Sequence, residues 1–135
     1  MQKPLGRIET IAASGTEQIP GVIPLVRART LSITTRLTFG QGIDADAVVY
    51  VYYSPDGNKW DTLNLTSWGI TFTTSTTKQI TKIIDVPEHG HIIIKVTNGS
   101  DADTLADVIG WYSIQSWAET DAQSRGLIDT ADVYD

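Results

Sequence analysis

The stretch that decides the fold is Val48–Leu65, which reads VVYVYYSPDGNKWDTLNL. Its β-branched and aromatic run Val48–Tyr53 predicts a strand whose two faces are both at least partly covered. Ser54–Asn58 then has the composition of a tight turn, because proline presets φ, aspartate bonds to nearby backbone and glycine supplies a positive φ. A second run, Trp60–Leu65, follows the turn, so the stretch as a whole predicts a β-hairpin.

Outward from this hairpin, the longest regular alternation is Arg27–Phe39. One face of the predicted strand carries Leu31, Ile33, Thr35, Leu37 and Phe39, and the other carries polar residues. Such a strand has one face on a core and the other toward water. Turn residues separate the runs, and no stretch has a clear helical period. About eight strands of this kind predict an all-β chain, folded as an antiparallel β-sandwich or jelly roll. The other expected strands are Arg7–Ala13, Trp68–Thr73, Gln79–Val86, Gly90–Asn98 and Thr104–Trp117.

The pattern divides the chain into an extended N-terminal arm at residues 1–24, a sandwich domain at 25–117 and an acidic C-terminal tail at 118–135. Two glycines and two prolines interrupt residues 14–24, so regular sheet is not expected to continue there. The apolar residues of the arm lie either on the chain's own core or on a neighbouring subunit. The tail is either disordered or docks on a partner. If both segments serve assembly, the candidate contacts are Ile19, Val22, Ile23, Leu25, Leu127, Ile128, Val133 and Tyr134.

Length and composition narrow the class of protein. The 135 residues suffice for one domain with a core that needs no disulfide, and the chain contains no cysteine. That excludes thiol nucleophiles and thiolate metal sites, and it fits a reducing cytoplasm. The net charge of −6 disfavours direct binding to nucleic acid, which requires clustered lysine and arginine. No apolar run is long enough to cross a membrane, and Met1–Gly6 lacks the apolar core of a secretion signal.

Two groups of residues have ligand types that metals use. His89 and His91 flank Gly90, a spacing that puts both imidazoles on one face of a strand, but Glu88 is the only further ligand beside them. A solvated turn is therefore the favoured interpretation. Several loop aspartates offer oxygen ligands for calcium but lack the EF-hand spacing and its glutamate. No metal or cofactor is expected. These aspartates are Asp44, Asp46, Asp101, Asp103 and Asp107.

The sequence has no pattern typical of an enzyme. It contains no GxSxG elbow and no glycine-rich phosphate loop, and its only two histidines are clustered. Its glutamates are few, so a carboxylate pair for glycoside hydrolysis has little support. Catalytic residues are therefore not expected.

The four tryptophans allow two interpretations. Aromatic rings on a sandwich face can stack on sugars, and Trp60 and Trp68 lie beside turn residues, where exposure is expected. These two are the candidate glycan contacts. The favoured alternative is that the tryptophans close the ends of the core. Trp111 and Trp117 are expected in or near that core.

Two motifs carry a resemblance to a known group of proteins. The hairpin VVYVYYSPDGNKWDTL is followed by the strand motif DVPEHGHIIIKVTNGSDADT and a closing aromatic strand. This combination, over Arg27–Trp117, resembles small β-sandwich proteins of tailed-phage virions, where a DG hairpin and a later alternating strand ending in asparagine recur. Similar DG hairpins occur in discoidin-like and sugar-binding sandwiches.

The resemblance implies a non-enzymatic structural protein of the virion, of the capsid decoration or cement type. Its partners would be the major capsid protein or other virion subunits, and a homo-oligomer, such as a trimer, would be expected. It would be made in the host cytoplasm and reside in the virion, without contact to nucleic acid or membrane. Two alternatives stay open: a carbohydrate-binding or adhesion module on a phage tail, and a tail-tube or connector component.

Overall fold

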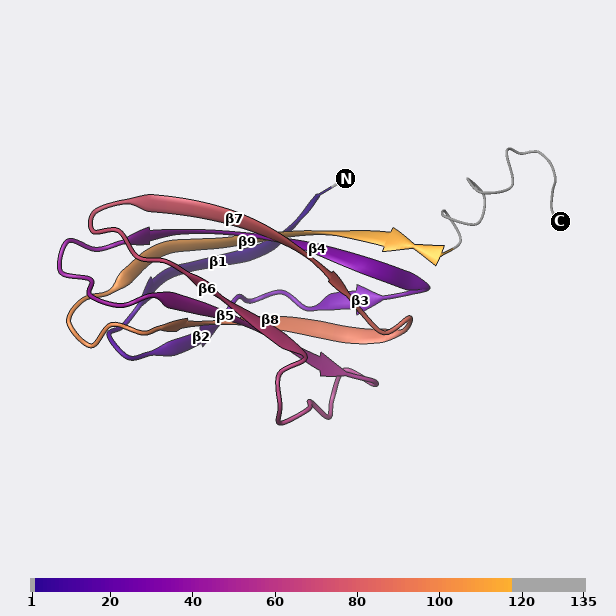
Figure 1. Cartoon of the computed structure of the whole chain (residues 1–135). Coiled ribbons are helices and arrows are strands. Elements are labelled where there is room, and N and C mark those ends of the chain that lie inside the picture. Colours follow the sequence, from indigo (N-terminus) through magenta and orange to yellow (C-terminus); the bar gives the residue numbers. More distant parts are fainter. Residues whose placement is uncertain (1, 118–135) are drawn as a thin grey trace, which may run out of the picture.

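The computed structural model describes residues 2–117, and this part of the chain is almost entirely β-structure (Figure 1). It confirms the all-β antiparallel sandwich, with nine strands where about eight were expected. The chain is therefore organised by strand pairing, as the alternation predicted. The strands are β1 (Lys3–Ile11), β2 (Thr16–Gln18), β3 (Ile23–Leu25), β4 (Ala28–Phe39), β5 (Ala47–Ser54), β6 (Thr66–Ile70), β7 (Thr77–Asp85), β8 (Gly90–Asn98) and β9 (Leu105–Ser116).

The strand pairs are nested one inside the next, which is the arrangement of a jelly roll. From the outside inward, β1 pairs with β9, β2 and β3 pair with β8, β4 pairs with β7, and β5 pairs with β6. The nested pairs form one long two-stranded ribbon. This ribbon folds over itself, so that β4 also pairs with β9 and β5 also pairs with β8. The result is two packed sheets: sheet A in the order β1-β9-β4-β7, and sheet B in the order β2-β8-β5-β6, with β3 also on β8 (Figure 1).

The core lies between the two sheets and is built from every second residue of the long strands. The alternation in β4 and β5 places one set of side chains inward and the other outward, as a half-buried strand requires. Burial of each large aliphatic side chain contributes about 1.5–3 kcal/mol. The largest fully buried side chains are Ile11, Ile19, Ile23, Leu31, Ile33, Leu37, Phe39, Val49, Val51, Ile92, Ile94 and Leu105.

The N-terminal segment corrects the predicted arm. Strand β1 pairs with β9 over most of its length, and β2 and β3 add to the edge of sheet B. Ile19, Ile23 and Leu25 are buried in the chain's own core. Pro24 fits between two buried residues because β3 is an edge strand, where a missing N–H costs no ladder bond. The sandwich therefore begins at Lys3 rather than at residue 25.

The hairpin is also corrected in detail. β5 and β6 do pair, from Ala47 opposite Ile70 to Val51 opposite Thr66. Residues 55–65, however, form a long connecting loop rather than a tight turn followed at once by a strand. Within this loop the Asp61 N–H donates to the Tyr53 carbonyl at 3.0 Å and the Leu65 N–H donates to the Val51 carbonyl at 2.7 Å, so the loop stays attached to β5 without forming a regular ladder.

Candidate functional sites

The loop that joins β5 to β6 starts with a turn organised by one carboxylate. The Asp56 Oδ1 atom accepts hydrogen bonds from the backbone N–H groups of Asn58 at 2.8 Å and Lys59 at 2.9 Å. The Gly57 N–H donates to Ser54 Oγ at 2.9 Å. The N–H groups of Lys59 and Asn58 lower the pKa of Asp56 because they bind its charged form. The turn is thus built from the residues that the sequence singled out.

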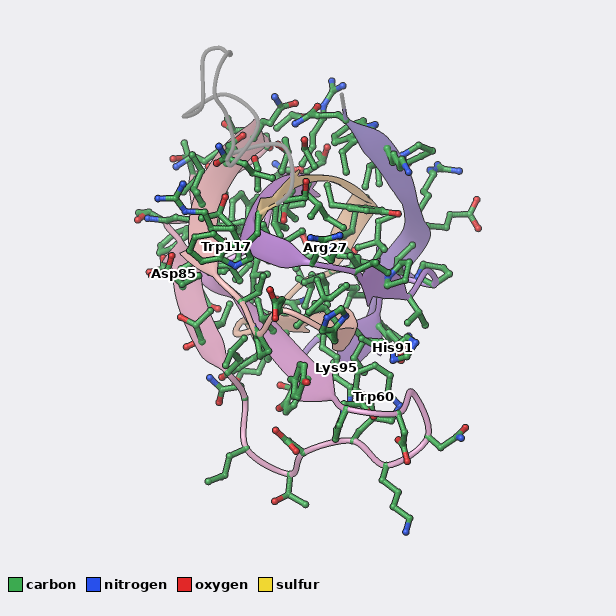
Figure 2. All side chains as sticks on the ribbon, turned by 90° about the vertical axis from the view of Figure 1, so that its right-hand side faces the viewer. Arg27, Trp60, Asp85, His91, Lys95 and Trp117 are labelled. Carbon is green, nitrogen blue, oxygen red and sulfur yellow. The ribbon has the colours of Figure 1, made fainter. Side chains whose placement is uncertain are left out.

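The turn packs against the outer face of sheet B. Gly57 has a φ of 81°, and a Cβ atom at this position would lie 3.2 Å from the His91 ring, so only glycine fits well here. The Asp61 N–H donates to the Tyr53 carbonyl at 3.0 Å, which closes the turn onto β5. Trp60 is half-buried just before this bond, on the sheet B side of the molecule (Figure 2).

The outer face of sheet B carries two tyrosines and a lysine. Tyr50 lies directly opposite Lys95, and Tyr52 lies opposite Ile93. The Tyr50 and Tyr52 ring centroids are 6.4 Å apart with the rings inclined by 34°, and Lys95 Nζ lies 5.0 Å from the Tyr52 ring centroid. This cluster of Tyr50, Tyr52 and Lys95 is called the tyrosine face below.

The tyrosine face was missed by the sequence analysis, although a signal was present. In the run from Val48 to Tyr53, Val49 and Val51 are fully buried, so Tyr50 must point the other way. The same rule corrects the glycan prediction for Trp68. Trp68 pairs with Val49 and therefore faces inward, where it packs against the core with its Nε1 atom buried and without a hydrogen-bond partner.

Exposed apolar side chains occur on the segments that lead to or from one end of the sandwich. At this end β4 and β8 begin, β5, β7 and β9 finish, and the 55–65 loop lies beside them (Figure 1, right). Seven large apolar residues among residues 2–117 are exposed. Six of them belong to segments that lead to or from this end: Val22 before β3, Val26 between β3 and β4, Leu63 and Leu65 in the 55–65 loop, Ile83 in the last part of β7, and Trp117 after β9. Phe72 lies elsewhere, where its backbone N–H donates to Asp46 at 3.0 Å. We call this group the apolar end. It consists of Val22, Val26, Leu63, Leu65, Ile83 and Trp117.

Trp117 at this end is held by two arginine residues. Its backbone N–H donates to the Arg27 carbonyl at 2.7 Å, and the Arg29 guanidinium lies 5.1 Å from the centroid of its ring. Trp117 is 42% exposed, and Trp111 lies on the outer face of sheet A, opposite Thr34. The prediction that both tryptophans lie in or near the core is therefore wrong. The side chains of β9 that face the core stand at the other set of alternating positions.

The other end of the sandwich is acidic and bound together by backbone contacts. Asp103 accepts the Gly42 N–H at 2.7 Å and the Thr104 N–H at 2.8 Å, and these bonds lower its pKa. Ser100 Oγ donates to Asp44 at 2.6 Å. These aspartates thus act as turn residues. Within residues 2–117, no three His, Asp or Glu side chains gather where they could hold a metal ion.

The two histidines do not form a pair of ligands. His91 lies on the outer face of sheet B against the turn, whereas His89 is exposed with its Nε2 atom 3.9 Å from Glu88. The residues described by the structure also include no helix long and apolar enough to cross a membrane.

The predicted assembly contacts separate into three groups. Ile19, Ile23 and Leu25 are buried core residues, so their prediction as contacts with a neighbour is wrong. Val22 is exposed at the apolar end. The remaining four, Leu127, Ile128, Val133 and Tyr134, lie outside the described residues.

Comparison with known proteins identifies similar folds but assigns the chain to no family. No family model matches the chain, and neither does any curated protein. Among solved structures, the enzymatically active domain of tailspike protein 4 of bacteriophage CBA120 is similar with a TM-score of 0.55, at 11% identity over 81% of this chain. The PBSX exported protein XepA has a TM-score of 0.54, at 8% identity over 86% of this chain. This chain spans only 15% and 37% of those two chains.

A carbohydrate-binding module is similar over most of its length. The module CBM6cm-2 from Cellvibrio mixtus lichenase 5A, solved in complex with cellotriose, has a TM-score of 0.50 at 10% identity, covering 85% of this chain and 87% of that one. At such identities these likenesses show a shared fold alone. The chain is a β-sandwich of a kind found in phage proteins and in carbohydrate-binding modules, which agrees with the resemblance to phage β-sandwiches only at this general level.

Proposed function

We propose that this chain is a non-enzymatic structural protein of a virion, of the capsid decoration or cement type, which docks on an assembled shell through the apolar end. The observation that carries the proposal is that six of the seven exposed large apolar side chains of residues 2–117 belong to segments that lead to or from that end. Exposed apolar groups of this kind mark surfaces that another protein covers. The partner would be the major capsid protein or another virion subunit.

Trp117 is the best anchor for such a contact. Tryptophan and arginine are the residue types that most often dominate interface energies. The bond to the Arg27 carbonyl and the Arg29 guanidinium over the ring hold Trp117 in place before any partner arrives. A side chain that is already ordered loses less conformational entropy on binding.

The opposite end carries exposed aspartates in its loops, including Asp44 and Asp101. The apolar end also carries exposed carboxylates, including Asp61 and Asp85, so it is the apolar side chains rather than the distribution of charge that favour this end as the contact surface. A module docked by the apolar end would point this acidic end toward solvent. The like charges of neighbouring copies would then disfavour a second layer and keep the free protein soluble.

The test is co-sedimentation of the full chain with virion shells from which it has been removed. Val26→Asp and Leu63→Asp place a charge at exposed positions of the apolar end, so neither should disturb the fold. Each should weaken binding about tenfold or more, the effect of losing roughly 1.4 kcal/mol of interface energy. Phe72→Asp, at the opposite end, is the matched control and should bind normally.

Equal loss for all three variants, or normal binding by the first two, would contradict the proposal. Light scattering of the free protein adds the oligomeric state. A stable trimer would mean that copies associate before they reach the shell, whereas a monomer would place the first contact at the shell itself.

A further inference from the structure

The tyrosine face is a second surface, distinct from the apolar end. The register of sheet B places Gln18, Lys95, Tyr50 and Ser67 in one row across four strands. Tyr52 lies in the next row, beside Ile93, which is only 5% exposed although it points outward. Two aromatic rings are thus flanked by amide, hydroxyl and ammonium groups on a flat backbone support.

The charge on this face is unusual for the chain. The outward positions of the paired strands in sheet B include no aspartate or glutamate, although the whole chain has a net charge of −6. Lys95 makes no ion pair with any carboxylate of residues 2–117, and its ammonium group lies over the Tyr52 ring. An anionic group on a ligand would find here a cation without a competing partner.

We propose that the tyrosine face binds a saccharide that carries carboxylates, such as a chain of uronic acids. The apolar face of a sugar ring would stack on Tyr50 and Tyr52, since aromatic rings combine apolar surface with low conformational entropy. The uronate carboxylate would accept a charge-assisted hydrogen bond from Lys95 Nζ. Gln18 and Ser67 supply hydrogen-bonding groups for the hydroxyls at either side of this row.

The turn after β5 gives the site a boundary. Gly57 packs on the His91 ring at the end of the same face, so the 54–61 turn lies over the sheet there. Trp60 is half-buried in this turn. The face is open in the other direction, along β8 toward Thr97, whose hydroxyl already bonds to that of Thr16 at 2.7 Å. A saccharide chain would therefore lie along the strands and end at the turn.

The proposal is tested by calorimetric titration of the full chain with hexagalacturonate and, in parallel, with the neutral cellohexaose. Hexagalacturonate should bind, and cellohexaose should bind at least tenfold more weakly. Tyr52→Ala should weaken hexagalacturonate binding tenfold or more, whereas Tyr50→Phe, which keeps the ring, should change it less than threefold. Lys95→Met keeps the apolar stem and removes the charge, so it should bring the hexagalacturonate affinity down to that of cellohexaose.

Trp111→Ala is the matched control, because it removes an aromatic side chain from the outer face of the other sheet. It should bind hexagalacturonate as the unmodified chain does. No binding of hexagalacturonate by the folded chain would overturn the proposal, as would equal affinity for the two sugars or equal loss in Trp111→Ala. Loss of shell binding by Tyr52→Ala, without any sugar binding, would instead identify the face as a protein contact. Val26→Asp lies outside both the tyrosine face and the 55–65 loop, so this variant tests shell binding separately from saccharide binding.

Discussion

Replacing Thr35 by valine should make the protein more stable, although it removes a polar group from a polar-looking strand. Thr35 is fully buried on the inner face of β4, and its Oγ1 atom has no hydrogen-bond partner. A buried hydroxyl without a partner costs about 1–3 kcal/mol, because water would otherwise have satisfied it. Valine has the same branched shape and fits a strand equally well.

The expected gain is about 1–2 kcal/mol in the free energy of unfolding, which corresponds to a rise of about 3–8 °C in Tm for a domain of this size. Urea denaturation followed by tryptophan fluorescence measures it, and the m-value should stay the same. The adjacent Thr34→Val is the matched control. Thr34 is also buried, but its Oγ1 atom bonds to Thr81 Oγ1 at 2.8 Å and to Gln2 Nε2 at 2.9 Å.

Thr34→Val should therefore destabilise the protein by about 0.5–1.5 kcal/mol, the usual net contribution of such bonds. The reasoning is refuted if Thr35→Val is no more stable than the unmodified chain. It is equally refuted if both variants gain stability, because the gain would then come from valine itself rather than from the unpaired hydroxyl.

Three further predictions follow from particular contacts. Ile19→Ala should cost about 2–5 kcal/mol in urea denaturation, whereas Val22→Ala should cost less than about 0.5, because only Ile19 is a core residue. Asn98→Ala should cost about 2–4 kcal/mol, since the buried side chain donates to a backbone carbonyl at 2.7 Å and accepts a backbone N–H at 3.0 Å. The pKa of Asp56 is lowered, so its support of the turn is present above the ordinary carboxyl pKa and is lost as pH falls through the folded value. The amide NMR signal of Asn58 should shift over that acidic range, and Asp56→Asn should abolish the shift.

The long strands could be predicted because their signal is local. The run Gly90–Asn98 was expected with the bounds that the structure gives to β8, and Gln79–Val86 differs from β7 by a few residues. Alternation over nine or more residues reports directly on which face is buried. The same alternation, with Val49 and Val51 as the buried positions, predicts that Tyr50 and Tyr52 point outward. Trp68 pairs with Val49 and therefore points inward.

For the first 25 residues, the alternative that their apolar side chains lie on the chain's own core is confirmed for Ile19, Ile23 and Leu25, but the strand pairing could not be predicted, because it depends on partners far away in the sequence. β1 finds its neighbour in β9, with Ile11 opposite Leu105, and β2 and β3 find theirs in β8. Strands of three residues have no period to detect, and the prolines and glycines around them are typical of a linker as well. The apolar end has the same origin, since its residues come from segments far apart in the chain, including the 55–65 loop and strand β7.

The loop of residues 55–65 joins the two proposed surfaces. Leu63 and Leu65 belong to the apolar end, while Gly57 packs on His91 at the edge of the tyrosine face. The Asp56 turn holds the first part of this loop through the N–H groups of Asn58 and Lys59, and the Leu65 N–H donates to the Val51 carbonyl at 2.7 Å at its end. An effect of one occupied surface on the other would pass along this loop. Asp56→Ala removes the oxygen that accepts the two N–H groups while leaving the residues of each surface unchanged, so a coupling between shell and saccharide binding in the full chain should weaken in this variant.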